Sequence, residues 1–149
     1  MEKTFRTLRG FLAGQEPKSD LYFAYSATLR ICGTGLNFDE ITDRLGLQPQ
    51  TLHRKGEKPD PRHAGFKDDM WAYSPPVEKN CPLSEHVDAL WTQLKPHRNY
   101  LLGLKRTFEI DVFLGYRSNC DNAGIIVPSR SLEMFTELEI PFAVSIIIT

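Results

Sequence analysis

The chain has 149 residues, of which 41% are hydrophobic and 25% are charged. This length and composition suit a single globular domain that buries a core of its own, and they exclude a largely disordered chain. The formal net charge of −1 leaves no basic excess over the whole chain, which argues against nucleic acid as the main partner.

Residues 1–20 are predicted to form an N-terminal appendage and linker, followed by a single domain over residues 21–149. Apolar residues recur at nearly helical spacing before Gly14: Phe5, Leu8, Phe11 and Leu12. Arg6 and Arg9 interrupt them, so the segment lacks the unbroken apolar run of a secretory signal. This short amphipathic helix would dock on its own domain, or contact a partner or a second copy of the chain.

The first half of the domain is predicted to contain a strand, a helix and a further strand. Apolar and polar side chains alternate over residues 21–32, as they do in a half-buried strand. Asn37 is placed to cap a helix that Gly46 would end in the left-handed conformation. A polar loop over residues 50–68 then leads to a strand at residues 69–74.

The second half of the domain begins with a long helical segment and ends with strands. Apolar residues repeat at helical spacing after Pro82, and Pro96 would break or kink this helix. Apolar residues also occupy every second position over residues 108–117, which predicts a strand with a short hairpin partner at residues 125–127. A short helix and a last strand at residues 142–148 complete the chain.

These elements predict an α+β fold. Both halves contain a strand, a helix and a strand, and their helices end in similar sequences at residues 45–49 and 138–141. We therefore expect a ferredoxin-like, duplicated β-α-β layout: a two-layer sandwich with a mainly antiparallel sheet of about four to six strands and the long helix inserted between the halves. Every apolar run in the sequence is too short to cross a bilayer, including residues 146–148, so we expect a cytoplasmic protein without membrane contact.

No group of residues has the spacing of a catalytic or metal site. The turn at residues 33–35 lacks the third glycine of a dinucleotide-binding loop, because Phe38 stands in its place. Cys81 and His86 are five positions apart and do not share a helix face. The three cysteines are widely spaced and the four histidines show no ligand pattern. We therefore expect reduced thiols, no metal, no cofactor and no enzymatic activity.

Two groups of residues are candidates for binding. The first comprises basic residues in the polar loop and aromatic residues just after it: Arg54, Lys55, Arg62, Trp71 and Tyr73. Basic side chains near aromatic rings could hold a phosphate or stack a base, or they could meet an acidic protein surface. The alternative is a solvated loop in which Arg54 is anchored to a nearby carboxylate.

The second group lies on one face of the strand predicted at residues 108–117: Asp111, Phe113 and Arg117. If helices cover the opposite face of the sheet, this face is open. A charged and aromatic surface of this kind suits a protein partner or a second copy of the chain, although an ordinary solvated sheet face has the same composition.

Several short motifs follow one another in the order seen in a known family. They are Arg-Ile-Cys-Gly at 30–33, Phe-Asp-Glu-Ile-Thr at 38–42, Leu-Gly-Leu-Gln-Pro at 45–49, Arg-Lys-Gly-Glu at 54–57, and Trp71. Together they resemble the small bacterial proteins catalogued as domain of unknown function 4279, over most of the chain. The resemblance implies a bacterial or phage origin and one α+β domain, and it brings no catalytic residues. Small families of this type are often encoded beside secreted toxins as immunity proteins, which suggests that role.

We therefore expect a non-enzymatic protein-interaction module, of the immunity type that binds a toxin, with a protein partner or self-association. The alternative is a module that binds a small ligand or nucleic acid through the basic loop at residues 53–67, although the overall charge argues against nucleic acid.

Overall fold

The computed structural model describes residues 21–120 and 124–149. The strands are β1 (Phe23–Gly33), β2 (Thr51–His53), β3 (Asp69–Tyr73), β4 (Glu109–Ser118) and β5 (Phe142–Ile148). The α-helices are α2 (Phe38–Leu45), α3 (Leu83–Leu94), α4 (Arg98–Leu104) and α5 (Glu133–Leu138), and the short 3-10 helices are η1 (Lys95–His97) and η2 (Ser129–Leu132).

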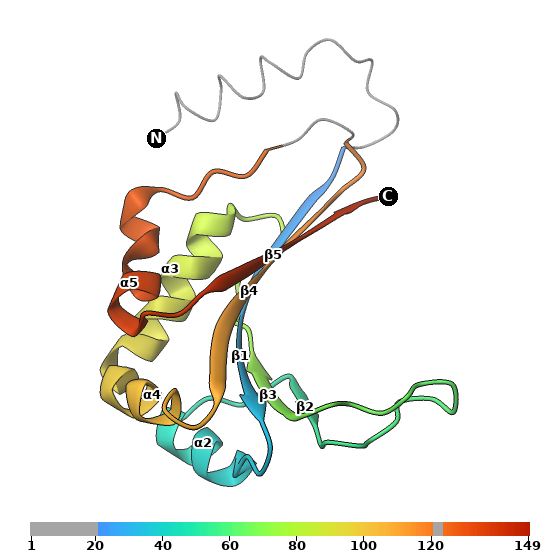
Figure 1. Ribbon diagram of the computed structural model, residues 1–149. Coiled ribbons are helices and arrows are strands. Elements are labelled where there is room, and N and C mark those ends of the chain that lie inside the picture. The colour runs from blue at the N-terminus through green and yellow to red at the C-terminus, as the bar shows by residue number, and fades with distance from the viewer. Residues whose placement is uncertain (1–20, 121–123) are drawn as a thin grey trace.

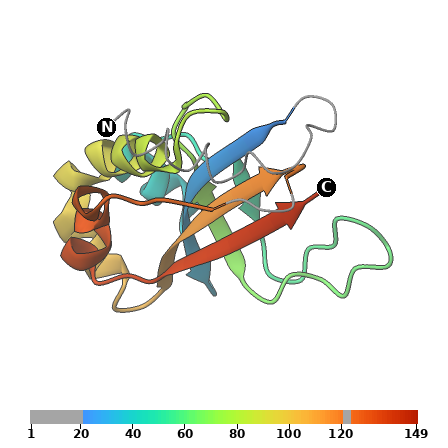
Figure 2. The ribbon, with the colours of Figure 1, turned by 90° about the horizontal axis from the view of Figure 1, so that it is seen from above.

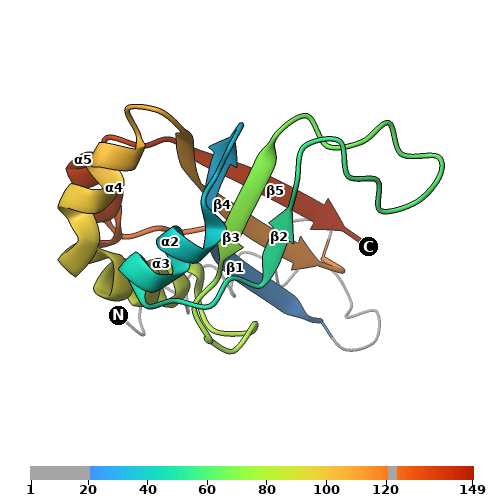
Figure 3. The same cartoon turned by 90° about the horizontal axis from the view of Figure 1, so that it is seen from below.

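The strands form one five-stranded sheet in the order β2-β3-β1-β4-β5. Neighbouring strands are antiparallel except for β4 and β5, which are parallel. The described helices lie on one side of this sheet (Figures 1 and 3). The structure therefore confirms an α+β fold with a mainly antiparallel sheet.

The duplicated, ferredoxin-like layout is not confirmed. The first helical connection joins β1 to β2, and β3 lies between those two strands. The connection through α5 instead joins β4 to its direct neighbour β5. The predicted hairpin is also wrong, because residues 125–127 form no strand and β4 pairs with β1 and β5. The hairpin prediction rested on local turn residues, whereas the pairing partners of β4 come from distant parts of the chain.

The core lies between the sheet and the helices. Every second side chain of β1 points to the helices, and Leu29 and Ile31 are fully buried there. On α3, Leu90 and Leu94 are also fully buried, as helical spacing predicts. Each such side chain contributes about 1.5–3 kcal/mol through removal of its apolar surface from water. This leaves the opposite face of the sheet free of helices (Figure 2).

The predicted helix signals near α2 are confirmed. The Asn37 side chain accepts a hydrogen bond from the Glu40 backbone N–H at 3.2 Å. Gly46 adopts a φ of 65° and its N–H donates to the Thr42 carbonyl, which ends the helix. Further along, Pro96 lies in η1, so the long helical segment is divided into α3 and α4 as its sequence predicts.

Two further findings concern the part of the chain that the structure describes. No helix there is long and apolar enough to cross a membrane. Nor do three or more histidine, cysteine or acidic side chains come together there in a way that could hold a metal ion.

His86 on α3 is a buried histidine, with 3% of its surface exposed. Among the described residues, its Nε2 atom has no hydrogen-bond partner. Burial lowers the pKa of His86 below its ordinary value of 6.5, and backbone hydrogen bonds at Cys81 and Glu78 only partly oppose this effect. In the unfolded chain this side chain binds a proton as the pH falls through about 6.5. In the folded protein it stays neutral to a lower pH.

This burial predicts acid sensitivity. As the pH falls below 6.5, the unfolded chain binds a proton at His86 that the folded chain does not, so stability present above that pH is lost. We expect His86→Leu to reduce the drop in free energy of unfolding between about pH 7.5 and about pH 5.5, measured with urea. His97→Leu is the control and should keep the wild-type drop. An unchanged drop in His86→Leu would contradict the assignment.

Candidate functional site

The face of the sheet without helices carries a paired arginine and aspartate at its centre. Arg30 on β1 lies directly opposite Asp111 on β4. Its Nε donates to Asp111 Oδ1 at 2.8 Å and its Nη2 to Oδ2 at 2.5 Å. The guanidinium also lies over the Phe113 ring, 4.7 Å from the ring centroid. The hydrogen bonds from Arg30 to Asp111 raise the pKa of this arginine, so its guanidinium group stays charged.

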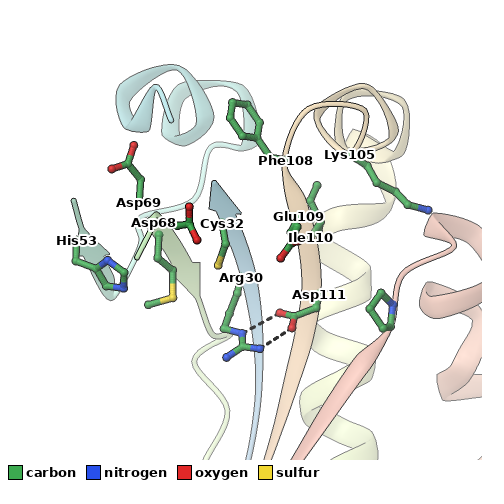
Figure 4. A pocket seen from close by; sticks show the side chains of 12 residues that line it. Arg30, Cys32, His53, Asp68, Asp69, Lys105, Phe108, Glu109, Ile110 and Asp111 are labelled. Carbon is green, nitrogen blue, oxygen red and sulfur yellow. Dashed lines mark hydrogen bonds and ion pairs between the residues drawn. The ribbon is translucent and has the colours of Figure 1, made fainter. Parts of the chain in front are cut away.

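A groove of about 540 Å³ lies beside this ion pair, at the end of the sheet near β1 and β4 (Figure 4). Cys32 and Ile110 line it together with the ion pair, and Asp68, Glu109 and Lys105 are among its charged residues. Burial is the main cause of a raised pKa at the Cys32 thiol, and its proximity to Arg30 offsets this only in part. The thiol therefore stays protonated near neutral pH and is a poor nucleophile.

The charges around the groove are unequally compensated. Lys105 Nζ donates to the backbone carbonyls of Leu138 and Glu139, which holds the ammonium at the edge. Within residues 21–120 and 124–149, no cation lies within ion-pair distance of Asp68 or Glu109, and both are exposed. Figure 4 shows these two carboxylates on either side of Cys32. The groove therefore presents free negative charge to solvent.

Asp69, next in the chain to Asp68, is by contrast fully engaged. One carboxylate oxygen accepts hydrogen bonds from the backbone N–H groups of Gly35 at 2.9 Å and Leu36 at 3.0 Å. The other accepts from the Lys55 backbone N–H at 2.8 Å. These backbone hydrogen bonds, led by that from Lys55, hold the pKa of Asp69 below its ordinary value, although its burial opposes them. A single carboxylate thus joins β3 to the turn after β1 and to the segment after β2.

Arg54 completes this junction. Its Nη1 donates to Asp69 Oδ2 at 3.2 Å and to the Leu36 carbonyl at 2.6 Å. Its guanidinium also lies 3.7 Å from the centroid of the Phe38 ring. Arg54 is thus anchored to a nearby carboxylate, which is the alternative to ligand binding stated in the sequence analysis.

Residues 54–68 form an arm that projects away from the helices (Figure 1). Backbone hydrogen bonds cross it from Gly56 N–H to the Phe66 carbonyl at 2.8 Å and from Phe66 N–H to the Glu57 carbonyl at 3.0 Å. The Phe66 ring stacks on His53, with ring centroids 3.6 Å apart. The polar loop predicted from the sequence is therefore an arm, and hydrogen bonds and ring stacking hold together its part next to the sheet.

The predicted binding residues are divided between separate places. Asp111 and Phe113 meet Arg30 on the open face, and Arg117 is exposed farther along the same strand. Lys55 is exposed at the base of the arm and donates to Thr34, and Arg62 is exposed near its tip.

Trp71 and Tyr73 point the opposite way, into the helical side of the sheet. Trp71 is fully buried, and its Nε1 donates to the Thr42 hydroxyl on α2 at 3.0 Å. Tyr73 is 6% exposed and donates to Gln93 on α3 at 2.6 Å. Neither ring offers a free face to a ligand, so the structure does not bring these aromatic residues together with the basic ones. The groove is lined by Asp111 but by neither Arg54 nor Trp71.

Sequence reasoning missed Arg30, Asp68 and Cys32 as parts of one site. Their positions in or beside predicted strands are visible in the sequence. What was missing was the pairing of β1 with both β3 and β4, which brings the three side chains to the same groove.

Comparison of the sequence with known families matches it to the family described as a domain of unknown function (DUF4279), over residues 23–149. The chain belongs to this family. The match includes all five strands and the described helices, and it begins after the N-terminal segment. Comparison with curated proteins and with solved structures found no match. The DUF4279 fold thus identifies the domain without assigning a reaction or a partner to it.

Asp69→Asn tests the junction between β3 and the arm. The asparagine side chain accepts hydrogen bonds only at its oxygen. Its NH2 group would face a backbone N–H that now donates to Asp69. We expect the free energy of unfolding to fall by about 2–4 kcal/mol near neutral pH, since a buried, multiply bonded charge is lost.

Asp68→Asn is the matched control, because Asp68 is exposed and, among the described residues, accepts only a long hydrogen bond of 3.5 Å from Thr34. Little change in stability is expected. The stabilisation by Asp69 is present above its unfolded pKa near 3.8 and is lost as the pH falls through the lower folded pKa. Urea unfolding of both variants checks this, and equal stabilities would refute the role of Asp69.

Proposed function

We propose that this DUF4279 protein is a non-enzymatic protein-interaction module that binds a basic surface of a partner protein with its open sheet face. The observation that carries the proposal is the unequal compensation of charge at the groove. Asp111 is engaged by Arg30, while Asp68 and Glu109 have no cation within ion-pair distance among the described residues. A lysine or arginine side chain of a partner would supply the missing charge.

The groups that line the groove support binding over catalysis. Catalysis by proton transfer or nucleophilic attack needs a group whose pKa is tuned toward the working pH. The pKa of the Cys32 thiol is shifted upward, away from reactivity. Arg30 is held by Asp111, so it forms part of a rigid platform with Phe113. Rigid aromatic and arginine groups of this kind are typical anchors of protein interfaces.

An immunity-type role, in which the protein occludes a toxin, is the specific form of this proposal. A toxin that acts on nucleic acid must carry a basic surface, because phosphate contacts dominate such binding. The free carboxylates of Asp68 and Glu109 are complementary to a surface of that kind. Occlusion would then block the toxin by competing for the same cationic residues.

The test is affinity capture of proteins from native host cells with charge-reversal variants. We expect the double variant Asp68→Lys, Glu109→Lys to lose a stoichiometric partner that the wild type retains, with affinity lower by about tenfold or more. Asp43→Lys, Glu78→Lys is the control, because it makes the same charge change at exposed sites on α2 and in the segment before α3. The control should retain the partner.

Two results would reject the groove as the binding surface. One is that no protein is retained in stoichiometric amount by the wild type. The other is that the groove variant and the control retain the partner equally well. The immunity role needs the further result that the captured protein is toxic in cells and that the wild type, but not the groove variant, protects them.

The arm offers a second candidate function, the binding of a phosphate-containing ligand. The side chain of Arg62 is 96% exposed, and Lys58 and Lys67 are exposed without an acidic side chain in ion-pair distance in the described part of the chain. Because Trp71 is buried, such binding would rest on charge without base stacking on that ring.

Fluorescence anisotropy with a short single-stranded oligonucleotide distinguishes this second function. If the arm binds phosphates, Lys58→Glu with Lys67→Glu should abolish a binding signal that also weakens as salt is raised. A signal that is insensitive to salt, or unchanged in the double variant, would exclude the arm as the site.

A further inference from the structure

The helix side of β5 is an apolar surface that the described part of the chain leaves uncovered. Val144, Ile146 and Ile148 pair in register with buried residues of β4, so they point to the same side as the core. They are nevertheless 48%, 62% and 46% exposed, respectively. α5 covers only the start of the strand, where the rings of Phe135 and Phe142 lie 4.9 Å apart. Figure 2 shows β5 running away from α5 toward the C-terminus.

β5 is also an edge strand without the usual protection of such strands. Natural edge strands carry charges, prolines or bulges that prevent pairing with other chains. Residues 142–148 contain no charged residue and no proline. An apolar edge of this kind needs a cover, either from the same chain or from another molecule.

The chain enters the described domain beside this surface. The Tyr22 backbone N–H donates to Asn119 at 3.1 Å, and its carbonyl accepts from the Ser118 hydroxyl at 2.9 Å. The Tyr22 hydroxyl also hydrogen-bonds to Thr149, the residue that follows β5. Residues 1–20 are therefore tethered at the C-terminal end of the uncovered strand.

The length of residues 1–20 matches the surface. A helix from Phe5 to Leu12 would be about 12 Å long, and Val144 to Ile148 in a strand span about 13 Å. The connecting residues 13–20 can extend to about 26 Å, which reaches every part of β5. A short tether also gives the segment an effective concentration in the millimolar range, well above that of a second copy in solution.

We propose that the N-terminal segment docks on the helix side of β5 and places its apolar stripe, Phe5, Leu8, Phe11 and Leu12, against Val144, Ile146 and Ile148. The segment lies outside the DUF4279 match, which begins at residue 23. It would cover the apolar side chains of β5 and leave the open face of the sheet free for a partner.

Limited trypsin digestion of the full-length protein tests the docking through cleavage after Arg6 and Arg9. Ile146→Gln should weaken the contact and speed this cleavage about tenfold. Ile147→Gln is the matched control, because Ile147 is 41% exposed on the neighbouring position but points to the open face. It should leave the cleavage rate unchanged. Both residues are exposed, so neither variant should unfold the domain.

A second measurement uses changes in the segment itself. Leu8→Gln with Phe11→Gln should shift the methyl NMR signal of Ile146 and leave that of the buried Ile110 in place, whereas Arg6→Gln with Thr7→Gln should shift neither. Equal tryptic cleavage in wild type, Ile146→Gln and Ile147→Gln would overturn the proposal. Protection that increases with protein concentration would also overturn it, since a second copy would then be the cover.

Discussion

The antiparallel pairing of β1 with β4, from Phe23 opposite Ser118 to Cys32 opposite Glu109, is the contact on which the rest of the structure depends. Successive side chains alternate between the two faces of a sheet, so this register sets both surfaces at once. It places Leu29 beside Val112 in the core and Arg30 beside Asp111 outside. A slip of β4 by one residue would turn Asp111 into the core and Val112 out to solvent, which explains why one register is strongly favoured.

Asp69 determines which charges remain available at the open face. Its carboxylate accepts backbone hydrogen bonds from three residues in two segments and forms an ion pair with Arg54, so neither charge is free for a partner. Asp68, its neighbour in the chain, points to the groove without a cation in ion-pair distance in the described part of the protein. The acidic character of the groove thus arises from the engagement of neighbouring charges and is invisible in the overall net charge of −1.

The two proposals use opposite sides of the same sheet. The groove lies on the open face between β3, β1 and β4, whereas the uncovered apolar residues of β5 lie on the helix side. A partner protein and the N-terminal segment could therefore bind at the same time. Because they depend on different physics, charge at the groove and apolar burial at β5, each can fail while the other holds.

The sequence by itself determined the local elements, because alternation, helical spacing and capping act over a few residues. It predicted β1, β3, β4 and β5, the α2 caps at Asn37 and Gly46, and the common face of Asp111, Phe113 and Arg117. Alternation also showed that Trp71 and Tyr73 share a face, but it could not show which face packs on helices. Only the tertiary structure decided the strand order, the burial of those two rings and the pairing of Arg30 with Asp111. These depend on which distant strands pair, and strand pairing is set by the packing of the whole core.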